Sequence, residues 1–587
     1  MNALVVLLIS VLSLVAGYWL YARSINRTVL QPDDRKATPA KMYMDGVDFT
    51  PANRNVLFGY QFKSIAALGP ILGPIIAVQW GWLPALLWIV LGTFFIGWVQ
   101  DYSSIIMGVR EEGQSFGALS YRLISPRSRT VLITFIYFYL WLIMGSFGVQ
   151  VGFNLLTNPA VPLGAIIVIL VGLLAGQMTY KWKQDIILTS VVTVVLSFLG
   201  IWVGTLPFAQ NLFAAILGVA GGKASPVLFL QVTQAKFVGS LLVVIICYFG
   251  AVLPIWRWAQ PINYVSFWIV SLGILGGIVG LLIWRPSMGD FPAYRTFNVA
   301  GLGPLWPMLF VTIACGAISG WHSLVSSSGT ARQLEKETDA LFVGGGAMFL
   351  EMVFATVAFL TATVAFGSYD GYVKAGGGAA AAKVFSVGLA TFMNQWGLDK
   401  GFGTAYGSIF LTLMALTIMY LVVRFMRVAS SEALGDAFPP IRNVHVGTVI
   451  ALALTLALIW LVPFLQIWAV FGAANQLMAS LALLLVTLWL MSKGKQYMWT
   501  LIPFAFMFIT TVGALIYKAY EAFFINLPKT ANPVVNKIAN VGEFTAAQVI
   551  IGAVALILVG AALFLAWDGL KALQRGRAGA PVAAKAR

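Results

Sequence analysis

Four ionisable side chains stand inside long apolar stretches of the chain: Lys63, Asp101, His322 and Glu351. A charged group is costly in an apolar environment, so each of the four is a candidate for function. A carboxyl group or an imidazole in such a site can take up and release a proton near neutral pH. An ammonium there can bind a carboxylate or take the place of a coupling cation. We interpret Asp101, His322 and Glu351 as candidates for proton coupling, and Lys63 as a candidate ligand for an anion.

Each of these residues also has a structural interpretation. Lys63 stands only about ten residues into its apolar stretch, so its ammonium could reach the membrane interface. The two carboxylates could be tied to an arginine or to free backbone amides, and His322 could be a hydrogen-bonded packing residue. Asn475 and Gln476 follow three small residues, a pattern typical of close helix contacts bridged by amides. We interpret this last pair as structural.

The remaining histidine and the cysteines suggest no further chemistry. His445 lies in a basic loop, and Cys247 and Cys315 lie in separate apolar stretches. This pattern indicates neither a metal-ligand cluster nor a disulfide framework. We expect no metal, no cofactor and no enzymatic activity.

The elements that carry these residues are membrane-spanning helices. Of the 587 residues, 60% are hydrophobic and 10% are charged. Soluble proteins carry about 25% charged residues, so this chain cannot cover a water-facing surface and its solvent must be lipid. Apolar runs of about 20 residues predict helices that cross a bilayer. We predict an all-α integral membrane protein with about fifteen spans, at 3–22, 53–79, 82–108, 130–152, 161–179, 185–206, 232–253, 262–284, 302–325, 341–367, 403–423, 446–462, 467–491, 498–517 and 546–568.

Basic residues collect in alternate loops. The formal net charge is +16, which on a soluble protein would suggest a nucleic-acid partner, but in membrane proteins Lys and Arg gather in cytoplasmic loops. With loop 23–52 in the cytoplasm, that side holds 25 Lys and Arg against 10 on the other. We predict a multi-pass protein of the bacterial inner membrane with an outside N-terminus, a cytoplasmic C-terminus and no nucleic-acid partner. The basic tail contains Lys571, Arg575, Arg577, Lys585 and Arg587.

Two of the predicted spans are interrupted. Span 53–79 contains two Gly-Pro pairs, at 69–70 and 73–74, and span 302–325 contains two glycines and a serine within 316–320. Proline removes a backbone donor and glycine loosens the helix. Unwound backbone at membrane depth occurs only inside protein or along a cavity, and paired broken helices indicate the binding site of a secondary transporter. We predict a substrate site between the breaks, formed by Lys63, Gly69, Pro70, Gly73, Ser319, Gly320 and Ser323.

The spacing of the breaks predicts an inverted repeat. Span 302–325 is the seventh after span 53–79, an odd step, so the two broken helices cross the membrane in opposite directions. Two five-helix repeats of opposite orientation require this arrangement. We divide the chain into a first helix with a basic loop, the first repeat, an inserted helix pair, the second repeat, and two peripheral helices with the basic tail. The boundaries are 1–52, 53–206, 207–300, 301–491 and 492–587.

No stretch between the spans is long enough for a soluble domain. The stretch 368–400 contains three consecutive glycines and an alanine run, and we interpret it as a flexible loop or a short surface helix. The sequence contains no P-loop pattern, so we expect no ATP-driven motor of its own. Energy for transport would come from an ion gradient, a partner or the solute gradient.

Several short motifs are specific to one family. They are Asp45-Gly46-Val47-Asp48 with Pro51-Ala52-Asn53, Val56-Leu57-Phe58-Gly59, the two Gly-Pro pairs, Val99-Gln100-Asp101, the run 313–320 with His322-Ser323-Leu324, Glu337-Thr338-Asp339-Ala340, and the run 471–477. At these motifs, over most of residues 30–490, the sequence resembles the carbon starvation protein A family of bacterial transporters. The resemblance implies uptake of pyruvate or peptides as carbon sources during nutrient limitation. It also implies the five-plus-five inverted repeat (LeuT-like) of the amino acid–polyamine–cation superfamily, in which the first and sixth helices are broken.

Some positions depart from the family pattern. Many relatives carry a His-His pair where this chain has Tyr60 and Gln61, and they often have alanine at the position of Lys63. In span 403–423 relatives tend to have an aspartate before an arginine, whereas here Tyr420 precedes Arg424. If the missing groups serve coupling or substrate choice in relatives, Lys63 is the candidate to compensate here.

These observations predict an ion-coupled secondary transporter, a proton symporter that takes up a small carboxylate such as pyruvate. Sodium is the alternative coupling ion. The first alternative function is a peptide transporter, whose cavity would be longer and charged at both ends. The second is a membrane sensor that binds a solute without moving it. A channel comes third, because no charged ring or repeated filter segment is visible. The sequence predicts neither stoichiometry nor oligomeric state.

Overall fold

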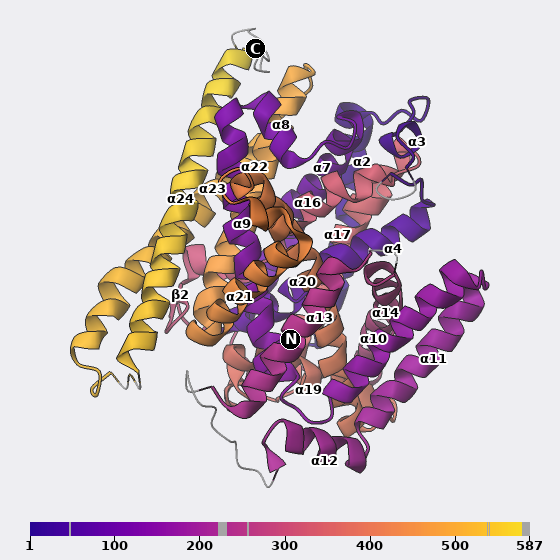
Figure 1. Ribbon diagram of the computed structural model, residues 1–587, viewed down its shortest axis with the longest axis vertical. Helices are drawn as coiled ribbons and strands as arrows, with labels where there is room; N and C mark the ends of the chain where they lie inside the picture. The colour runs from indigo at the N-terminus through magenta and orange to yellow at the C-terminus, as the bar shows by residue number, and fades with distance from the viewer. Residues whose placement is uncertain (46–48, 221–231, 255–256, 537, 539, 578–587) are drawn as a thin grey trace.

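The computed structural model describes residues 1–45, 49–220, 232–254, 257–536, 538 and 540–577. Motif positions 46–48 and the tail residues Lys585 and Arg587 therefore lie outside the described residues. The chain is built from helices (Figure 1). The α-helices are α1 (Ala3–Ala16), α2 (Arg23–Ile25), α3 (Pro39–Met42), α4 (Arg54–Ile65), α5 (Gly69–Ala77), α6 (Trp82–Gly92), α7 (Trp98–Arg110), α8 (Phe116–Leu123), α9 (Pro126–Val149), α10 (Pro162–Gly176), α11 (Ile186–Gly204), α12 (Pro207–Ile216), α13 (Gln234–Val252), α14 (Ala259–Trp284), α15 (Phe310–Thr312), α16 (Gly320–Ser328), α17 (Gly346–Val364), α18 (Tyr369–Lys374), α19 (Ala381–Asn394), α20 (Lys400–Leu434), α21 (Val444–Leu461), α22 (Phe464–Ser492), α23 (Met498–Tyr520) and α24 (Val541–Arg577).

Strands contribute little. Among the described residues, β1 (Asn298–Val299) and β2 (Gly303–Pro304) form one antiparallel pair. Its second strand lies at the start of the second interrupted span, 302–325.

Thirteen helices in the described ranges are long and apolar enough to cross a membrane. The bent pair Arg54–Ile65 and Gly69–Trp80 brings the number to as many as fourteen. The remaining expected span, 302–325, contains no continuous helix of spanning length, because residues 313–319 are not helical. The predicted fifteen spans thus compare with thirteen continuous helices, one bent pair and one segment that is broken more widely.

Polar caps and prolines explain where several long helices begin. The Asn53 side chain accepts a hydrogen bond from the Asn55 amide at 2.9 Å at the start of α4. Ser125 caps α9, whose first residue is Pro126, and Asp399 caps α20. These side chains satisfy amides that have no partner within the helix. They define the helix ends at positions where the apolar runs alone predict only approximate boundaries.

Burial separates central from peripheral helices. In the most apolar stretch of Phe464–Ser492 all residues are buried, and in that of Glu337–Val364 94% are buried. The corresponding share is 28% in Ile186–Gly204, and Figure 1 shows α11 and α24 at opposite edges of the bundle. Because lipid is as apolar as a protein core, exposed and buried helices have similar hydropathy. The structure, rather than hydropathy, therefore identifies α17, α20 and α22 as the centre.

The stretch 368–400 differs from the expectation of a flexible loop or surface helix. It forms α18 and α19, and ten of the fourteen residues of α19 are buried. Small residues such as these alanines allow neighbouring helices to approach closely, so the stretch packs inside the bundle.

The first long loop and the end of the chain lie at the same end of the bundle. The Arg110 guanidinium donates to the Leu30 carbonyl at 2.8 Å, and the Ser125 hydroxyl donates to Asp568 at 2.9 Å. Figure 1 shows α2, α3, α8 and the C-terminal end of α24 at the top, with α12 at the opposite end. The predicted topology likewise places loop 23–52 and the basic tail on one side of the membrane.

Candidate functional site

The first interrupted span bends between α4 and α5. The two helices meet at 46°, and residues 66–68 between them are not helical. Pro70 lacks an amide proton and cannot continue α4. The carbonyl of Ser64, near the end of α4, accepts a hydrogen bond from the Trp321 indole at 2.8 Å. The break is therefore tied directly to the second interrupted span.

The second interrupted span unwinds more extensively. Helix α15 ends at Thr312, and α16 begins at Gly320. Side chains from other helices donate to the exposed carbonyls: Gln476 to Ile313 at 3.0 Å, and Thr93 to Gly316 at 3.2 Å. Buried backbone groups need such partners, so the unwound segment is held by the helices around it.

Asn475 is the main link between α22 and this unwound segment. Its Oδ1 accepts from the Gly320 amide at 3.0 Å and from the Trp321 amide at 3.3 Å, and so caps α16. The same oxygen accepts from the Tyr139 hydroxyl at 2.7 Å and from Ser319 at 3.1 Å. Its amide nitrogen donates to the Ala314 carbonyl at 3.0 Å. The geometry agrees with a structural interpretation of the residue.

The two breaks are in direct contact. A Cβ added at Gly69 would lie 2.3 Å from the sulfur of Cys315, and one at Gly73 would lie 2.7 Å from the Thr312 carbonyl oxygen. Only glycine allows this approach. At these two predicted substrate residues the partner break fills the space, so a solute could enter between them only if the helices moved apart.

Lys63 lies at the end of α4, just before the first break. The side chain is 4% exposed, and its ammonium donates to the hydroxyl of Thr417 on α20 at 2.8 Å. No carboxylate among the described residues lies within ion-pair distance of it. It therefore does not reach the interface, and its charge lacks a counter-ion within the described protein.

Asp101, His322 and Glu351 come together, although they are far apart in sequence. They lie on α7, α16 and α17, and all three are fully buried. The His322 Nδ1 is 3.0 Å from Asp101 Oδ2, and its Nε2 is 3.4 Å from Glu351 Oε2. Both Glu351 oxygens lack a hydrogen-bond partner among the described residues. The arrangement is a chain of two carboxyl groups bridged by one imidazole, a geometry that can pass a proton.

The other predicted residues lie around these two centres. Pro70 is buried in the first turn of α5. Ser323 donates to the Gly320 carbonyl at 2.7 Å. Gln476 donates to backbone carbonyls of the second break. Among the described residues no group of three or more His, Cys, Asp or Glu could hold a metal ion.

Sequence reasoning missed two contributors. Thr417 supplies the hydroxyl at Lys63, and Tyr139 donates to Asn475. Hydroxyl residues are common in membrane helices, where they often bond to their own backbone, as Thr417 also does with the Leu413 carbonyl at 2.7 Å. Their positions in the sequence carried no signal that could have identified them.

Comparison with known proteins decides the family. The chain matches the family described as carbon starvation protein CstA over residues 2–375 and 370–514. It belongs to the carbon starvation protein CstA family.

Two curated relatives of this CstA-family chain have different names. The "Peptide transporter CstA" of Campylobacter jejuni is 28% identical, over 88% of this chain and 80% of the relative. The "Pyruvate/proton symporter BtsT" of Escherichia coli K12 is 27% identical, over 93% of this chain and 86% of the relative. Since the two identities are nearly equal, they do not favour one name over the other.

One solved structure is also similar to the CstA-family chain. The manganese transporter of Eremococcus coleocola is 13% identical, covers 88% of this chain and 94% of its own, and gives a TM-score of 0.41. A score this low does not establish a common topology, so the inverted repeat stays a prediction.

The departures from the CstA pattern lie beside the site. Gln61 donates to Ser326 at 3.0 Å and accepts from Thr330, both in the second interrupted span and its exit. The hydroxyl of Tyr420 donates to Asn263 at 2.9 Å on α14. Gln61 and Tyr420 thus link neighbouring helices. Neither is free to replace the His-His pair or the aspartate that relatives carry.

Proposed function

We propose that this CstA-family protein is a secondary transporter that carries a small carboxylate such as pyruvate together with a proton. The observation that carries the proposal is the buried chain Asp101–His322–Glu351 on three separate helices. An internal carboxyl group with no hydrogen-bond partner is costly to bury, and ionisable groups within membrane spans commonly belong to proton relays. The relative named a pyruvate/proton symporter supports the choice of solute and ion.

In this mechanism the imidazole passes the proton. A protonated Asp101 donates to Nδ1 of His322, while Nε2–H faces Glu351; transfer along the chain protonates Glu351 and leaves the opposite tautomer. The Nε2–Glu351 distance of 3.4 Å has to shorten for this step. Because His322 stands on α16, movement of the second interrupted span would open or close the proton path.

Lys63 supplies the charge for the anion. Its ammonium is buried beside the first break and meets the Thr417 hydroxyl instead of a carboxylate. A substrate carboxylate next to it would give the missing counter-charge. Binding between the breaks requires Gly69 and Cys315 to separate, so the contact between them belongs to a closed state.

The proposal includes the finer architecture. The two broken helices would be the first helices of two inverted five-helix repeats, in the bacterial inner membrane, with the N-terminus outside and the C-terminus in the cytoplasm. The positions of the two breaks and the distribution of basic loops support this arrangement.

Proteoliposomes with an internal pH indicator test the function. External pyruvate should acidify the lumen with the wild-type protein. We expect Glu351→Gln and Lys63→Met to reduce the initial rate at least about tenfold, because each removes a buried charged group that the cycle needs. Glu432→Gln is the matched control, since Glu432 is exposed and pairs with Arg129 at 3.4 Å. Full activity in both site variants would refute the residue roles.

Peptide transport is the second candidate, because a relative of nearly equal identity has that name. The same vesicles separate the two functions through competition of labelled pyruvate uptake by dipeptides. Uptake of dipeptide without uptake of pyruvate would replace our proposal. Binding of either solute with no flux would indicate a sensor.

A further inference from the structure

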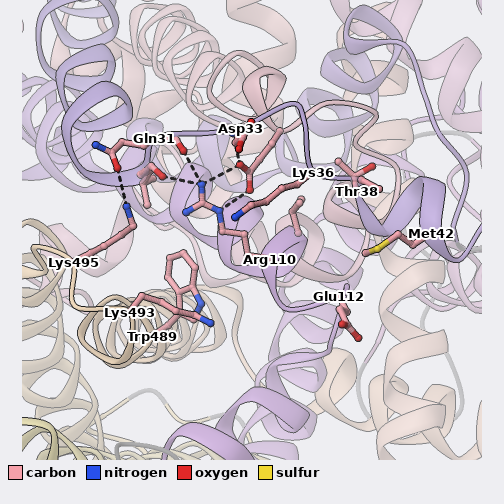
Figure 2. Close-up of a pocket in the computed structure, with 14 residues that line it drawn as sticks. Gln31, Asp33, Lys36, Thr38, Met42, Arg110, Glu112, Trp489, Lys493 and Lys495 are labelled. Atoms are coloured by element: carbon pink, nitrogen blue, oxygen red, sulfur yellow. Dashed lines mark hydrogen bonds and ion pairs between the residues drawn. The ribbon is translucent and has the colours of Figure 1, made fainter. Parts of the chain in front are cut away.

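A cavity of about 480 Å³ lies beyond the ends of α7 and α22, apart from the buried site. Figure 2 shows its lining residues, which come from four segments of the chain: the loop after α2, the end of α7, the segment before α17, and the turn between α22 and α23. Four cations line it, namely Lys36, Arg110, Lys493 and Lys495. The cavity therefore joins segments that are distant in sequence and are rich in basic residues.

The carboxylates that line this cavity already have partners. Glu337 accepts two bonds from Arg110, at 2.6 and 3.0 Å, and one from the Asp33 amide at 2.7 Å. The hydrogen bonds from Arg35 to Asp33 lower the pKa of that carboxyl to about 2. The hydrogen bond to Glu112 raises the pKa of Tyr43. Asp33 and Glu337 thus pair with arginines and Glu112 with a tyrosine hydroxyl, and none of the three forms an ion pair with Lys36 or Lys495.

Two of the cations form no ion pair in the described part of the chain. Within the described ranges, Lys36 and Lys495 have no carboxylate within 4 Å. Lys495 donates to the Val29 carbonyl at 2.7 Å and to the Gln31 side chain at 3.2 Å, both uncharged acceptors (Figure 2). Burial lowers the pKa of Lys495, the Arg110 guanidinium and Lys36 add to that effect, and the Glu337 carboxylate opposes it. Neither ammonium group therefore has a carboxylate in direct contact.

A buried hydroxyl in the same lining also lacks a partner. Thr38 is 1% exposed, lines the cavity, and its Oγ1 has no hydrogen-bond partner among the described residues. A buried polar atom without a partner is unusual in a folded protein and indicates a missing ligand or water. Two ammonium groups without an ion pair and one hydroxyl are donors for a multivalent oxyanion.

We propose that this cavity binds a phosphate group, carried by an anionic lipid or by a free phosphate ion. A phosphate offers several acceptor oxygens to Lys36, Lys495 and Thr38 at once, and basic pockets at the ends of membrane helices are suited to lipid headgroups. Bound there, it would join the loop after α2 to the turn between α22 and α23. The Arg110–Glu337 pair then connects it to α7 and α17, which carry Asp101 and Glu351.

Thermal unfolding of the purified full-length protein in neutral detergent tests this. We expect sodium phosphate to raise the unfolding temperature above that in sodium chloride of equal ionic strength. Lys36→Gln should weaken the apparent affinity for phosphate about tenfold, the effect of losing one charge-assisted hydrogen bond. Lys495→Gln should do the same. The Lys36 side chain is exposed and makes no ion pair with the described residues, so its variant guards against a folding defect. Lys336→Gln is the matched control, because Lys336 is exposed on the same segment as Glu337 but does not line the cavity.

A second arm identifies the source of the phosphate. The protein is placed in nanodiscs of phosphatidylcholine with or without phosphatidylglycerol. Stabilisation by phosphatidylglycerol that is lost in Lys36→Gln and Lys495→Gln, with no effect of free phosphate, assigns the site to a lipid headgroup. A response to free phosphate assigns it to a soluble ion. Stabilisation by neither, stabilisation unchanged in both variants, or a response to pyruvate in place of phosphate would overturn the proposal.

Discussion

The two interrupted spans are held in different ways. Residues 313–319 form a long unwound segment. Its carbonyls and the amides that follow it meet Asn475 of α22 and Thr93 of the π-helical segment Thr93–Gly97, and Tyr139 of α9 in turn donates to Asn475. The break at 66–68 is shorter, and Trp321 of the other span bonds to the Ser64 carbonyl beside it. The first break therefore depends partly on the second, whereas the second is anchored to the surrounding bundle.

The charged residues of the two spans also differ in the partners that the surrounding protein supplies. His322, after the long break, lies between two carboxyl groups. Lys63, before the short break, has a single hydroxyl partner. His322 in the second span thus has two carboxyl groups beside it. Lys63 in the first span has a charge that a bound anion can neutralise. The comparison suggests a division of labour, with proton transfer at one break and anion binding at the other.

Removal of Asn475 should have the largest effect on this comparison. Asn475→Ala leaves the Gly320 and Trp321 amides and the Ala314 carbonyl without their partner. Each buried group left unpaired costs about 1–3 kcal/mol, so we expect a loss of about 3 kcal/mol or more. Thermal unfolding in detergent measures it. Asn154→Ala is the control, since Asn154 is half-buried and its one side-chain hydrogen bond to the described residues goes to Gln150 at 3.0 Å. Equal stability of the two variants would show that the long break does not depend on α22.

Contact between the breaks should be broken by a single methyl group. Gly69→Ala places a Cβ 2.3 Å from the Cys315 sulfur, and overpacking of this kind costs about 1–3 kcal/mol. Gly59→Ala, in α4 of the same span, is the control, because the nearest atom to its Cβ is 3.8 Å away.

A double variant tests whether that cost arises between the two spans. Adding Cys315→Gly to Gly69→Ala removes the atoms that clash. We expect the pair to recover at least about 1 kcal/mol relative to the sum of the single changes. An additive result in unfolding experiments would mean that the breaks are not in contact in the resting protein.

The charge of Lys63 should lower stability in the absence of substrate. Lys63→Met keeps the length of the side chain and removes the unneutralised charge, and Thr417 still has the Leu413 carbonyl as its acceptor. We expect a gain of about 1–2 kcal/mol in the free energy of unfolding, together with loss of pyruvate uptake. Lys518 is the matched control, because it is also buried but pairs with Glu521. Lys518→Met should destabilise the protein, and a loss of stability in Lys63→Met would show that Lys63 has a counter-ion.

Much of this arrangement could be predicted from the sequence, and the limits have physical causes. Gly-Pro pairs act on the backbone locally, so the break after Ile65 is evident from residue types alone. Lys63, Asp101, His322 and Glu351 are equally evident, because any charge within an apolar run stands out. The contact among Asp101, His322 and Glu351 depends on how α7, α16 and α17 pack. This packing cannot be predicted from a single sequence.

Two further features could not be predicted for the same reason. The glycines and the alanine run in 368–400 predict a flexible loop or a short surface helix, but small residues also favour close helix packing, as in α19. The partner of Lys63 was missed because a threonine inside a membrane helix usually bonds to its own backbone. Both errors concern contacts between helices, which periodicity and composition do not specify.

The smallest effect should come from a single tether of the long break. Thr93→Val conserves shape but removes the hydrogen bond to the Gly316 carbonyl, 3.2 Å long, and we expect a loss of about 1 kcal/mol. Thr412→Val is the matched control: Thr412 is equally buried, but its hydroxyl donates to the Ser408 carbonyl in its own helix, which already accepts a backbone bond. A difference between the two variants in thermal unfolding measures one tether. If Thr93→Val instead costs as much as Asn475→Ala, the tethers act as one cooperative unit, and the long break would be as dependent on single contacts as the short one.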